Sequence, residues 1–368
     1  MIRVLHELGS LDGGGVARLL YDYYSFIDHE QVHFDFLIYN YYEQGILEQP
    51  LKELGCQVFK VPKIQDGRKD FLRGIDSVLN GNKYDIVHSH RGPQSFYVLN
   101  AAKKHGVNVR IAHSHLAYSP ESFSRKIKES ILIRMDKYLA TNLFACGSDA
   151  GKSMWGERSN FYVMHNAINL NKFVFSEKVR DEKRKEIGID NKDELVLGIV
   201  GRIEDQKNYP FLMKVMQRLL DKNNATLVVV GRGTLENNVK QMAIELGISD
   251  HVKFLGVRND VNCLLNAFDC FLLPSKYEGL PVVLIEAQAN GLYEIVSNTV
   301  TKEMAVTDLL TFLPNDEVEL WVKKIEDIAK SSNVAKRNGY ATILKDNGYS
   351  IHDEAIKLQS YYIKLVDE

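Results

Sequence analysis

Short apolar segments alternate with segments of helical length along almost the whole chain, and this pattern constrains the fold more than any other feature. Such alternation is typical of βαβ units, in which helices join parallel strands and cover the sheet. A first series of strands is predicted at residues 3–8, 34–39, 58–61, 86–88, 109–112 and 143–146. A second series is predicted at 195–201, 226–231, 252–255, 270–273 and 294–297. The sequence therefore predicts an α/β protein with two doubly wound, Rossmann-like domains.

The alternation breaks between the two series. It is lost around residues 164–173, and the densely charged stretch 176–193 follows, so we place the interdomain connection there. We expect an N-terminal domain at 1–168, a C-terminal domain at 169–349, and a closing helix at 350–368 that packs back towards the N-terminal domain. A chain of 368 residues is too long for one core, and its 45% hydrophobic content suffices for two. Because open parallel sheets bind ligands beyond the carboxyl ends of their strands, two such sheets facing one another would enclose a cleft.

The overall composition excludes several classes of protein. A net charge of −2 gives no general attraction to nucleic acid. The four cysteines lack C-x-x-C or zinc spacing and are typical of buried thiols in a reducing compartment. The chain opens on a strand instead of a secretory signal, and no window approaches the roughly 20 apolar residues of a membrane-spanning helix. These features predict a cytoplasmic protein whose membrane contact, if it has any, is peripheral.

Two glutamates, Glu278 and Glu286, are separated by seven residues across a predicted turn-to-helix junction. Pro281 suits the first position of that helix, because its ring fixes φ and it has no N–H to leave unpaired. The free backbone N–H groups from Leu280 onwards would form an anion site that a phosphate can approach past Gly279. Glu286 would lie about 7–8 Å further along the axis, which suits hydrogen bonds to ribose hydroxyls. The alternative is a capped helix with two solvated glutamates.

Other candidate ligand contacts also follow predicted strands. Arg202 and Lys207 come shortly after the strand that ends at Gly201, where fixed cations would stabilise a leaving diphosphate. The alternative is a pair of solvated loop charges. The loop Gly231-Arg232-Gly233 and the pair Val257 and Arg258 follow the next two strands, and ordinary turns are an equal alternative for both.

The glycine-rich loop at 12–16 permits close approach by a phosphate or an acceptor. It lacks the full dinucleotide fingerprint, which disfavours an NAD-dependent dehydrogenase.

Four histidines form two H-x-H pairs at the ends of neighbouring predicted strands: His88, His90, His113 and His115. They lack the flanking ligands and the carboxylate that we would require of a zinc site, so we expect no metal. A buried structural histidine is an even alternative to a functional role at each position. Residues 124–137 combine basic residues with a helical apolar pattern, which favours either contact with an anionic membrane or a helix packed on its own sheet.

Taken in order, five motifs resemble those of the family 4 retaining glycosyltransferases of the GT-B fold, and the similarity covers nearly the whole chain. They are Gly-Gly-Gly-Val-Ala-Arg at 13–18, Asp-Ile-Val-His-Ser-His at 85–90, Ile-Ala-His-Ser-His at 111–115, Gly201-Arg202-Ile203 with Lys207-Asn208, and the span from Glu278 to Glu286. The form of the last motif is most similar to that of bacterial capsular and exopolysaccharide enzymes. The resemblance implies transfer of a sugar from a nucleotide diphosphate, expected to be UDP, to a glycan acceptor, expected to be lipid-linked. It implies no cofactor, and the Asp-x-Asp pair that holds a metal in other glycosyltransferases is absent.

The resemblance also implies roles for individual residues. The catalytic group is expected to comprise Glu278, His115, Arg202 and Lys207. The donor-binding group is expected to comprise Gly14, Gly15, Gly201, Gly231, Gly233, Val257, Arg258, Gly279, Leu280, Pro281, Val282 and Glu286. The acceptor-side candidates are Gly13, His88, His90 and His113.

Two departures and two rival functions accompany this assignment. The segment Gly291-Leu292-Tyr293 lacks a proline that many relatives carry, and Glu294 places a charge where an apolar residue is usual, so local packing there is expected to differ. The chain also departs from the commoner Gly-Phe-Gly at 279–281, where Pro281 strengthens the helix start. The rival functions are a GT-B sugar-nucleotide epimerase and a non-catalytic nucleotide-sugar-binding partner of another transferase.

Overall fold

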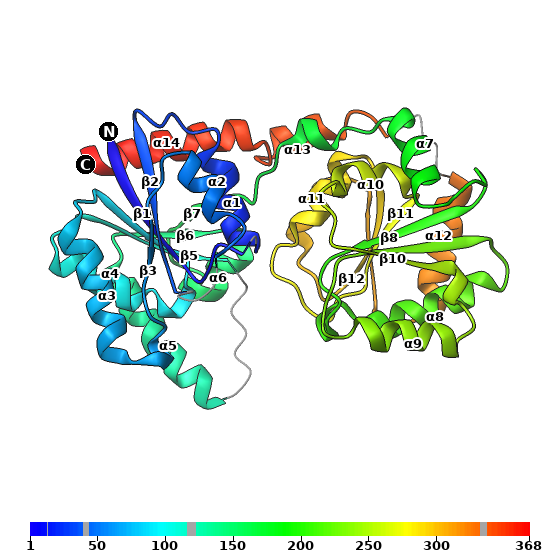
Figure 1. The fold of residues 1–368 in the computed structure, drawn as a ribbon, viewed down its shortest axis with the longest axis horizontal. Coiled ribbons are helices and arrows are strands. Elements are labelled where there is room, and N and C mark those ends of the chain that lie inside the picture. Colours follow the sequence, from blue (N-terminus) through cyan, green and yellow to red (C-terminus); the bar gives the residue numbers. More distant parts are fainter. Residues whose placement is uncertain (13, 40–43, 116–122, 332–336) are drawn as a thin grey trace. The chain divides into compact units, whose positions relative to one another are not determined.

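The computed structural model describes residues 1–368 except 13, 40–43, 116–122 and 332–336. It divides into two compact units, each built on its own parallel sheet (Figure 1). The first unit comprises Met1–Ile168 and Ser350–Glu368, and the second comprises Asn169–Tyr349. The predicted pair of doubly wound α/β domains is confirmed.

The first unit contains a seven-stranded sheet in the order β3-β2-β1-β4-β5-β6-β7, and all of its strand pairs are parallel. Helices cover both faces, because the strands are apolar on each side and form two separate cores with the helices. The strands are β1 (Ile2–Leu8), β2 (Val32–Ile38), β3 (Val58–Lys60), β4 (Ile86–Ser89), β5 (Val109–Ser114), β6 (Asn142–Ala145) and β7 (Tyr162–Val163). The α-helices are α1 (Gly15–Tyr24), α2 (Glu48–Glu53), α3 (Arg68–Gly81), α4 (Phe96–Lys104), α5 (Phe123–Leu139), α6 (Ser148–Trp155) and α14 (Ile351–Asp367).

The closing helix α14 belongs to the first unit. Its apolar residues recur at helical spacing, and Ala355, Leu358 and Tyr362 are fully buried in the core that contains α1 and the strands β1 and β2. The backbone N–H of Ile351 donates to the carbonyl of Ile168 at 3.0 Å, which joins the start of this helix to the end of the N-terminal segment.

The second unit contains a six-stranded parallel sheet in the order β10-β9-β8-β11-β12-β13. Its strands are β8 (Leu195–Val200), β9 (Ala225–Val230), β10 (Val252–Gly256), β11 (Cys270–Leu273), β12 (Tyr293–Ser297) and β13 (Leu310–Leu313). Its α-helices are α7 (Glu177–Glu186), α8 (Tyr209–Leu220), α9 (Glu236–Glu245), α10 (Val261–Ala267), α11 (Val282–Ala289), α12 (Val318–Ser331) and α13 (Tyr340–Asp346). Short 3-10 turns occur in both units at Ile64–Asp66, Gly92–Gln94, Leu170–Phe173, Asp205–Lys207, Ser249–His251 and Lys302–Met304.

Three features differ from the sequence prediction. The edge strands β7 and β13 were not predicted, because the first has only two residues and the second is only partly buried. The charged stretch 176–193 is not a simple connection, because it contains α7, which packs against α10. Arg180 and Arg184 of α7 are 8% and 6% exposed, so the charges that suggested a solvated linker lie inside the second unit.

Both sheets have a switch point, where the chain continues in opposite directions from neighbouring strands. It lies between β1 and β4 in the first unit and between β8 and β11 in the second. Ligands of open parallel sheets bind beyond the carboxyl ends of the strands at such points. In the described parts of the chain, no helix is both long enough and apolar enough to cross a bilayer.

Candidate functional site

Two of the predicted catalytic residues meet at the switch point of the second sheet. Lys207 lies on the loop after β8, and Glu278 lies on the loop after β11. The Nζ atom of Lys207 is 2.7 Å from Oε1 of Glu278, and only 12% and 9% of the two side chains are exposed. The pair therefore bridges the two strands from which a ligand of this sheet would be bound.

Gln206 completes this contact, although the sequence analysis did not identify it. Its Nε2 donates to Oε2 of Glu278 at 3.2 Å and to the carbonyl of Tyr277 at 2.9 Å. The backbone N–H of Lys276 donates to the carbonyl of Gln206 at 2.8 Å. Each carboxylate oxygen of Glu278 thus accepts a hydrogen bond from the β8 loop, and the two loops are held in register.

Glycines let the loops after β8 and β9 pack backbone against backbone. A Cβ atom on Gly231 would lie 2.0 Å from the carbonyl oxygen of Gly201, and one on Gly233 would lie 2.2 Å from that of Ile203. Gly231 also has φ 132°, which other residues rarely adopt. Glycine is therefore required here by space as well as by conformation. The bare backbone that results also suits the close approach of a phosphate.

The helix of the two-glutamate motif starts one residue later than predicted. Pro281 has φ −70° and precedes the first residue of α11, Val282. The first N–H groups of the helix have no partners within it, and an anion site at its N-terminus stays a prediction. Glu286 lies four residues into α11, about 6 Å along its axis from Val282, and is half-buried.

The remaining donor-side candidates differ in how they are presented. Arg202 is exposed, and the side chain of Val257 is 70% exposed. The guanidinium of Arg258 forms ion pairs with Asp260 at 2.7 Å and Glu186 at 2.6 Å, so this side chain stabilises the second unit itself. Gly279 and Leu280 are half-buried beside Pro281.

The glycine-rich loop belongs to the first unit. Gly14 precedes α1, and Gly15 is its first residue. A Cβ atom on either glycine would meet no other atom within 4 Å, so packing within the described residues does not demand glycine at these positions. Gly13 lies outside the described residues.

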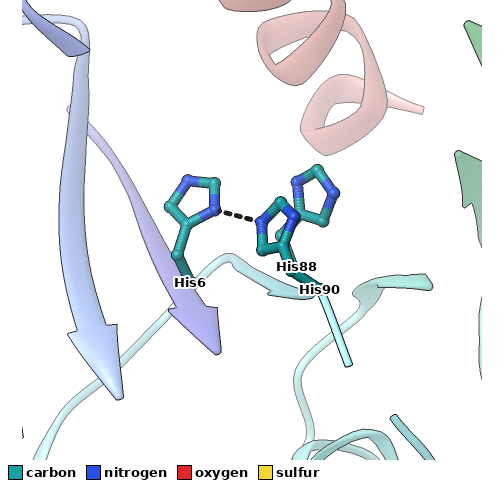
Figure 2. Close-up of side chains that lie close together, drawn as sticks. All are labelled: His6, His88 and His90. Atoms are coloured by element: carbon teal, nitrogen blue, oxygen red, sulfur yellow. Dashed lines mark hydrogen bonds between the residues drawn. The ribbon is translucent and has the colours of Figure 1, made fainter. Parts of the chain in front are cut away.

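The predicted histidines gather in the first unit with a fifth, His6, which the sequence analysis did not identify because a single histidine in an apolar strand gives no distinct signal. Figure 2 shows His6, His88 and His90, with the 2.9 Å contact between Nδ1 of His6 and Nε2 of His90. Nδ1 of His90 lies 2.8 Å from Nε2 of His115. Nε2 of His88 lies 3.1 Å from Nδ1 of His113, and its Nδ1 lies 2.7 Å from the hydroxyl of Tyr362.

Burial keeps this histidine cluster uncharged. It lowers the pKa of His6 and of His115 to about 3 and the pKa of the other three well below the ordinary value. His88 and His113 have no exposed surface and bond to each other, as expected of structural histidines. Two triplets, His6 with His88 and His90, and His90 with His113 and His115, hold ring nitrogens within 4.8 Å of one another. Many of those nitrogens are already engaged in the hydrogen bonds described above, which a metal ion would have to displace.

Two doubly wound Rossmann-like domains of this kind, with the ligand-binding switch point of the second lined by glycine loops and an ion pair, are typical of the GT-B fold. Residues 179–345 match the family model of the glycosyl transferases group 1. Over 98% of its length the chain is 33% identical to the putative glycosyltransferase EpsF of Bacillus subtilis (strain 168), of which it covers 96%. The chain belongs to this glycosyltransferase family.

Two further comparisons extend this finding. The chain is 26% identical to the UDP-Gal:alpha-D-GlcNAc-diphosphoundecaprenol alpha-1,3-galactosyltransferase of Escherichia coli, over 80% of this chain and 79% of that protein. Among solved structures, Anabaena Alr3699/HepE in complex with UDP matches with a TM-score of 0.83 at 16% identity, over 99% of this chain and 100% of that one. The second comparison concerns the fold alone.

Proposed function

We propose that this chain is a retaining, family 4 glycosyltransferase that moves a sugar from a UDP-sugar to a glycan carried on a lipid diphosphate, in capsular or exopolysaccharide synthesis. The observation that carries the proposal is the Lys207–Glu278 ion pair at the switch point of the second sheet. The UDP complex of the structural neighbour supports the donor, and the name of the Escherichia coli relative supports the acceptor.

In this proposal the protein supplies the positive charge that a metal supplies elsewhere. A diphosphate gains negative charge as the glycosidic bond breaks, and Lys207, Arg202 and the first N–H groups of α11 stabilise that charge. The contact with Glu278 holds Lys207 in place before the donor binds, so little reorganisation is needed during the reaction. Glu278 and His115 contact the donor sugar, and Glu286 binds the ribose. The acceptor hydroxyl attacks from the face that the diphosphate leaves.

A thermal-shift screen against UDP-, GDP-, ADP- and TDP-sugars tests the donor, because a ligand that binds only the native state raises its stability. We expect the UDP-sugars to give the largest shift.

In the transfer assay, Lys207→Ala should lower kcat by roughly 10²–10³-fold. Arg218→Ala is the matched control, because Arg218 is also ion-paired, at 2.6 Å and 2.7 Å, but lies near the end of α8. Equal turnover of Lys207→Ala and the control would remove Lys207 from the mechanism.

Product analysis tests the remaining parts of the proposal. A glycan lengthened by one sugar, with the anomeric configuration of the donor preserved, is the expected product. An isomerised donor would instead indicate an epimerase, and binding without turnover would indicate a non-catalytic partner. Activity that persists in a chelator is expected if no metal takes part.

A lipid-linked acceptor requires the protein to reach a membrane surface, and α5 has a suitable face. Ile127, Ile131, Met135 and Tyr138 recur at helical spacing and are 51%, 53%, 37% and 77% exposed. Lys128 and Arg134 are exposed on the same helix. An exposed apolar stripe beside basic side chains is typical of a helix that lies on an anionic membrane. The side chains of residues 123–126 lie outside the described part of the chain.

Vesicle sedimentation tests this face. We expect the protein to sediment with vesicles that contain anionic lipid, and Ile131→Glu to reduce that binding strongly because it places a charge in the apolar stripe. Ile244→Glu is the matched control, because Ile244 is also exposed, at 60%, but lies on α9 of the second unit. Equal sedimentation with anionic and neutral vesicles would count against membrane docking by α5.

A further inference from the structure

A cavity of about 300 Å³ lies in the first unit, and none of the residues that line it was predicted to be functional. Its lining includes Glu7 and Gly9 from the end of β1, Tyr39 after β2, Lys63 after β3 and Arg91 after β4. These four strands are neighbours in the sheet, and the step from β1 to β4 is its switch point. The cavity therefore occupies the place where an open parallel sheet binds its ligand.

One wall of the cavity carries a buried carboxyl group. Glu7 is 1% exposed, and it accepts hydrogen bonds from the hydroxyl of Tyr39 at 2.5 Å and from the hydroxyl of Ser89. Burial raises the pKa of Glu7 to about 7, against the opposing effects of Arg91 and these two hydrogen bonds. A carboxyl group that is about half protonated at pH 7 opposes the entry of an anion less than a fully ionised one would.

Two cations face the same space. The guanidinium of Arg91 lies 5.2 Å from the centre of the Tyr39 ring and donates to Gln94, yet its buried Nε has no hydrogen-bond partner within the described part of the chain. A Cβ atom on Gly9 would lie 3.1 Å from Nη1 of Arg91, so glycine leaves room for the guanidinium. Lys63 is exposed and forms no ion pair among the described residues. A guanidinium and an ammonium group beside one cavity are the usual side-chain partners of a phosphate.

The remaining wall is aromatic. The rings of Tyr39 and Phe71 lie 5.2 Å apart, and those of Phe71 and Tyr97 lie 5.3 Å apart at an interplanar angle of 89°. Apolar ring surface together with a few polar groups that fix orientation is the usual composition of a small-molecule site. The volume is at the lower end of such sites, which suits one sugar unit and its charged substituent better than a longer glycan.

We propose that this cavity binds the phosphate-bearing sugar of the acceptor. Arg91 and Lys63 bind the phosphate oxygens, while Glu7, Tyr39 and the aromatic wall hold the sugar ring. This inference rests on the proposed function for the identity of the acceptor, and it moves acceptor recognition from the predicted histidines to the carboxyl ends of β1 to β4. A lipid-linked sugar diphosphate and a free sugar phosphate share this chemistry.

Saturation-transfer NMR on the full chain tests binding without requiring turnover. The observed probes are N-acetylglucosamine 1-phosphate and N-acetylglucosamine, and inorganic phosphate, which has no carbon-bound proton, is added as a competitor. We expect the sugar phosphate to give the strongest transfer. Arg91→Gln and Lys63→Gln should each weaken its binding by at least tenfold. Lys83→Gln is the matched control, because Lys83 is an exposed cation that precedes β4, at the opposite end of the strand from Arg91.

The transfer assay then separates this proposal from the proposed function. Arg91→Gln and Lys63→Gln should raise the KM for a lipid-linked sugar diphosphate at least tenfold and leave the thermal shift given by UDP unchanged. A shorter-chain, water-soluble acceptor separates two possible causes of a raised KM. A loss of sugar-phosphate binding also raises the KM for this acceptor, whereas a loss of membrane contact does not. If transfer occurs with an unchanged acceptor KM in both variants, the cavity assignment is wrong and the proposed function stands. If the chain transfers no sugar but the sugar phosphate still binds in an Arg91-dependent manner, the proposed function is wrong and the cavity is a sugar-phosphate site that does not serve an acceptor.

Discussion

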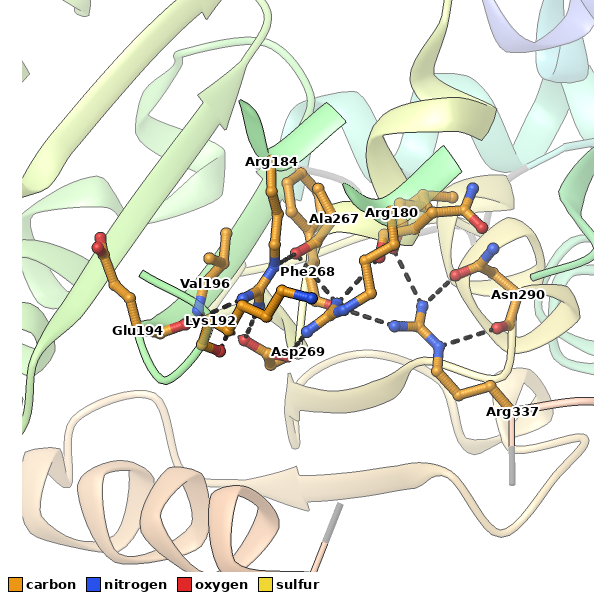
Figure 3. Close-up of polar contacts among 12 residues, drawn as sticks. Arg180, Arg184, Lys192, Glu194, Val196, Ala267, Phe268, Asp269, Asn290 and Arg337 are labelled. Atoms are coloured by element: carbon orange, nitrogen blue, oxygen red, sulfur yellow. Dashed lines mark hydrogen bonds and ion pairs between the residues drawn. The ribbon is translucent and has the colours of Figure 1, made fainter. Parts of the chain in front are cut away.

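The two units bury ionisable side chains in opposite ways. In the first, His6, His88, His90 and His113 are almost completely enclosed, and burial lowers the pKa of each far enough to leave it neutral. In the second, three buried arginines, Arg180, Arg184 and Arg337, keep their charge beside a single aspartate, Asp269 (Figure 3). The histidine cluster loses its charge on burial, whereas the arginine cluster is surrounded by partners.

The arginine cluster is stable because its partners are backbone carbonyls as well as a carboxylate. Arg180 and Arg184 each lie 2.5 Å from an oxygen of Asp269. Arg180 also donates to the carbonyls of Asn266, Ala267 and Phe268, at and just after the end of α10. Carbonyls at the end of a helix have no partners within it, so the guanidinium groups satisfy acceptors that burial would otherwise leave unpaired.

This difference predicts that the two clusters respond differently to pH. A histidine whose pKa is lower in the folded protein than in the unfolded chain makes its full contribution to the stability of the fold above about pH 6.5. That contribution is lost as the pH falls. Arg337 of the arginine cluster does not titrate in that range, because burial lowers its pKa only to about 9. Acid should therefore act mainly on the first unit.

The largest expected effect is selective unfolding of the first unit in acid. Between pH 7 and pH 4 the buried histidines should reduce its free energy of unfolding, by about 3 kcal/mol for His6, whose pKa burial lowers to about 3. Burial raises the pKa of Glu7 to about 7 and that of Asp136 to about 9, so these carboxyls act with the opposite sign and offset part of the loss. A net loss is expected that grows as the pH falls from about 6.5 towards 4.

The chain provides a fluorescent reporter for each unit. It has two tryptophans, Trp155 in the first unit and Trp321 in the second, and both are almost fully buried. Acid titration of Trp321→Phe therefore follows the first unit, and that of Trp155→Phe follows the second. The transition of Trp155 should occur at the higher pH. Coincident transitions would show that the neutral histidines do not decide acid stability.

A somewhat smaller effect is expected when one arginine of the cluster is removed. Arg180→Met should reduce the free energy of unfolding of the second unit by about 3–5 kcal/mol, because it leaves part of Asp269 and several carbonyls buried without partners. Denaturant unfolding followed by Trp321 in the Trp155→Phe background measures the loss. Arg218→Met is the control, because Arg218 makes ion pairs that are exposed and should change stability little. Equal effects of the two substitutions would mean that burial does not strengthen the cluster.

The contrast between the units also explains what the sequence could predict. The donor-side loops of the second unit carry their signal in contiguous residues. Gly231 and Gly233 must be glycine for the loops to approach each other, and Gly201 has a φ of 150° that favours glycine. The pairing of Lys207 with Glu278 follows from their positions after adjacent strands. The cavity of the first unit combines single residues from four separate strand ends, and none of these lies in a motif.

Burial was the property that the sequence predicted least well. The charged stretch that contains Arg180 and Arg184 has the composition of a solvated linker, and only the neighbouring carbonyls and Asp269 show why it is buried. His6 likewise looks like an isolated residue in a strand, although it contacts His90 across the step from β1 to β4. In both cases the partner is distant in sequence, so local patterns carry no information about it.

The smallest of the expected effects concerns Glu294, the charged residue that departs from the family pattern. It lies in β12 between Phe271 of β11 and Leu310 of β13, is fully buried, and within the described residues its two carboxylate oxygens have no hydrogen-bond partner. Burial raises the pKa of Glu294 well above its ordinary value. Because the pKa of this acid is higher in the folded protein than in the unfolded chain, Glu294 contributes most to stability below about pH 4.3. Its contribution falls as the pH rises, because the unfolded chain loses its proton first.

Replacement of Glu294 by leucine should therefore stabilise the second unit by about 1–3 kcal/mol at pH 8, through removal of an unpaired polar group of similar size. Urea unfolding of the Trp155→Phe background, followed by Trp321, measures the gain at pH 8 and again at pH 5, where it should be smaller. Glu294→Gln separates the two contributions, because it removes the titration but keeps a polar group in the core. If Glu294→Leu destabilises the unit at both pH values, Glu294 is held by a partner, and the second unit then follows a single rule in which every buried charge is paired.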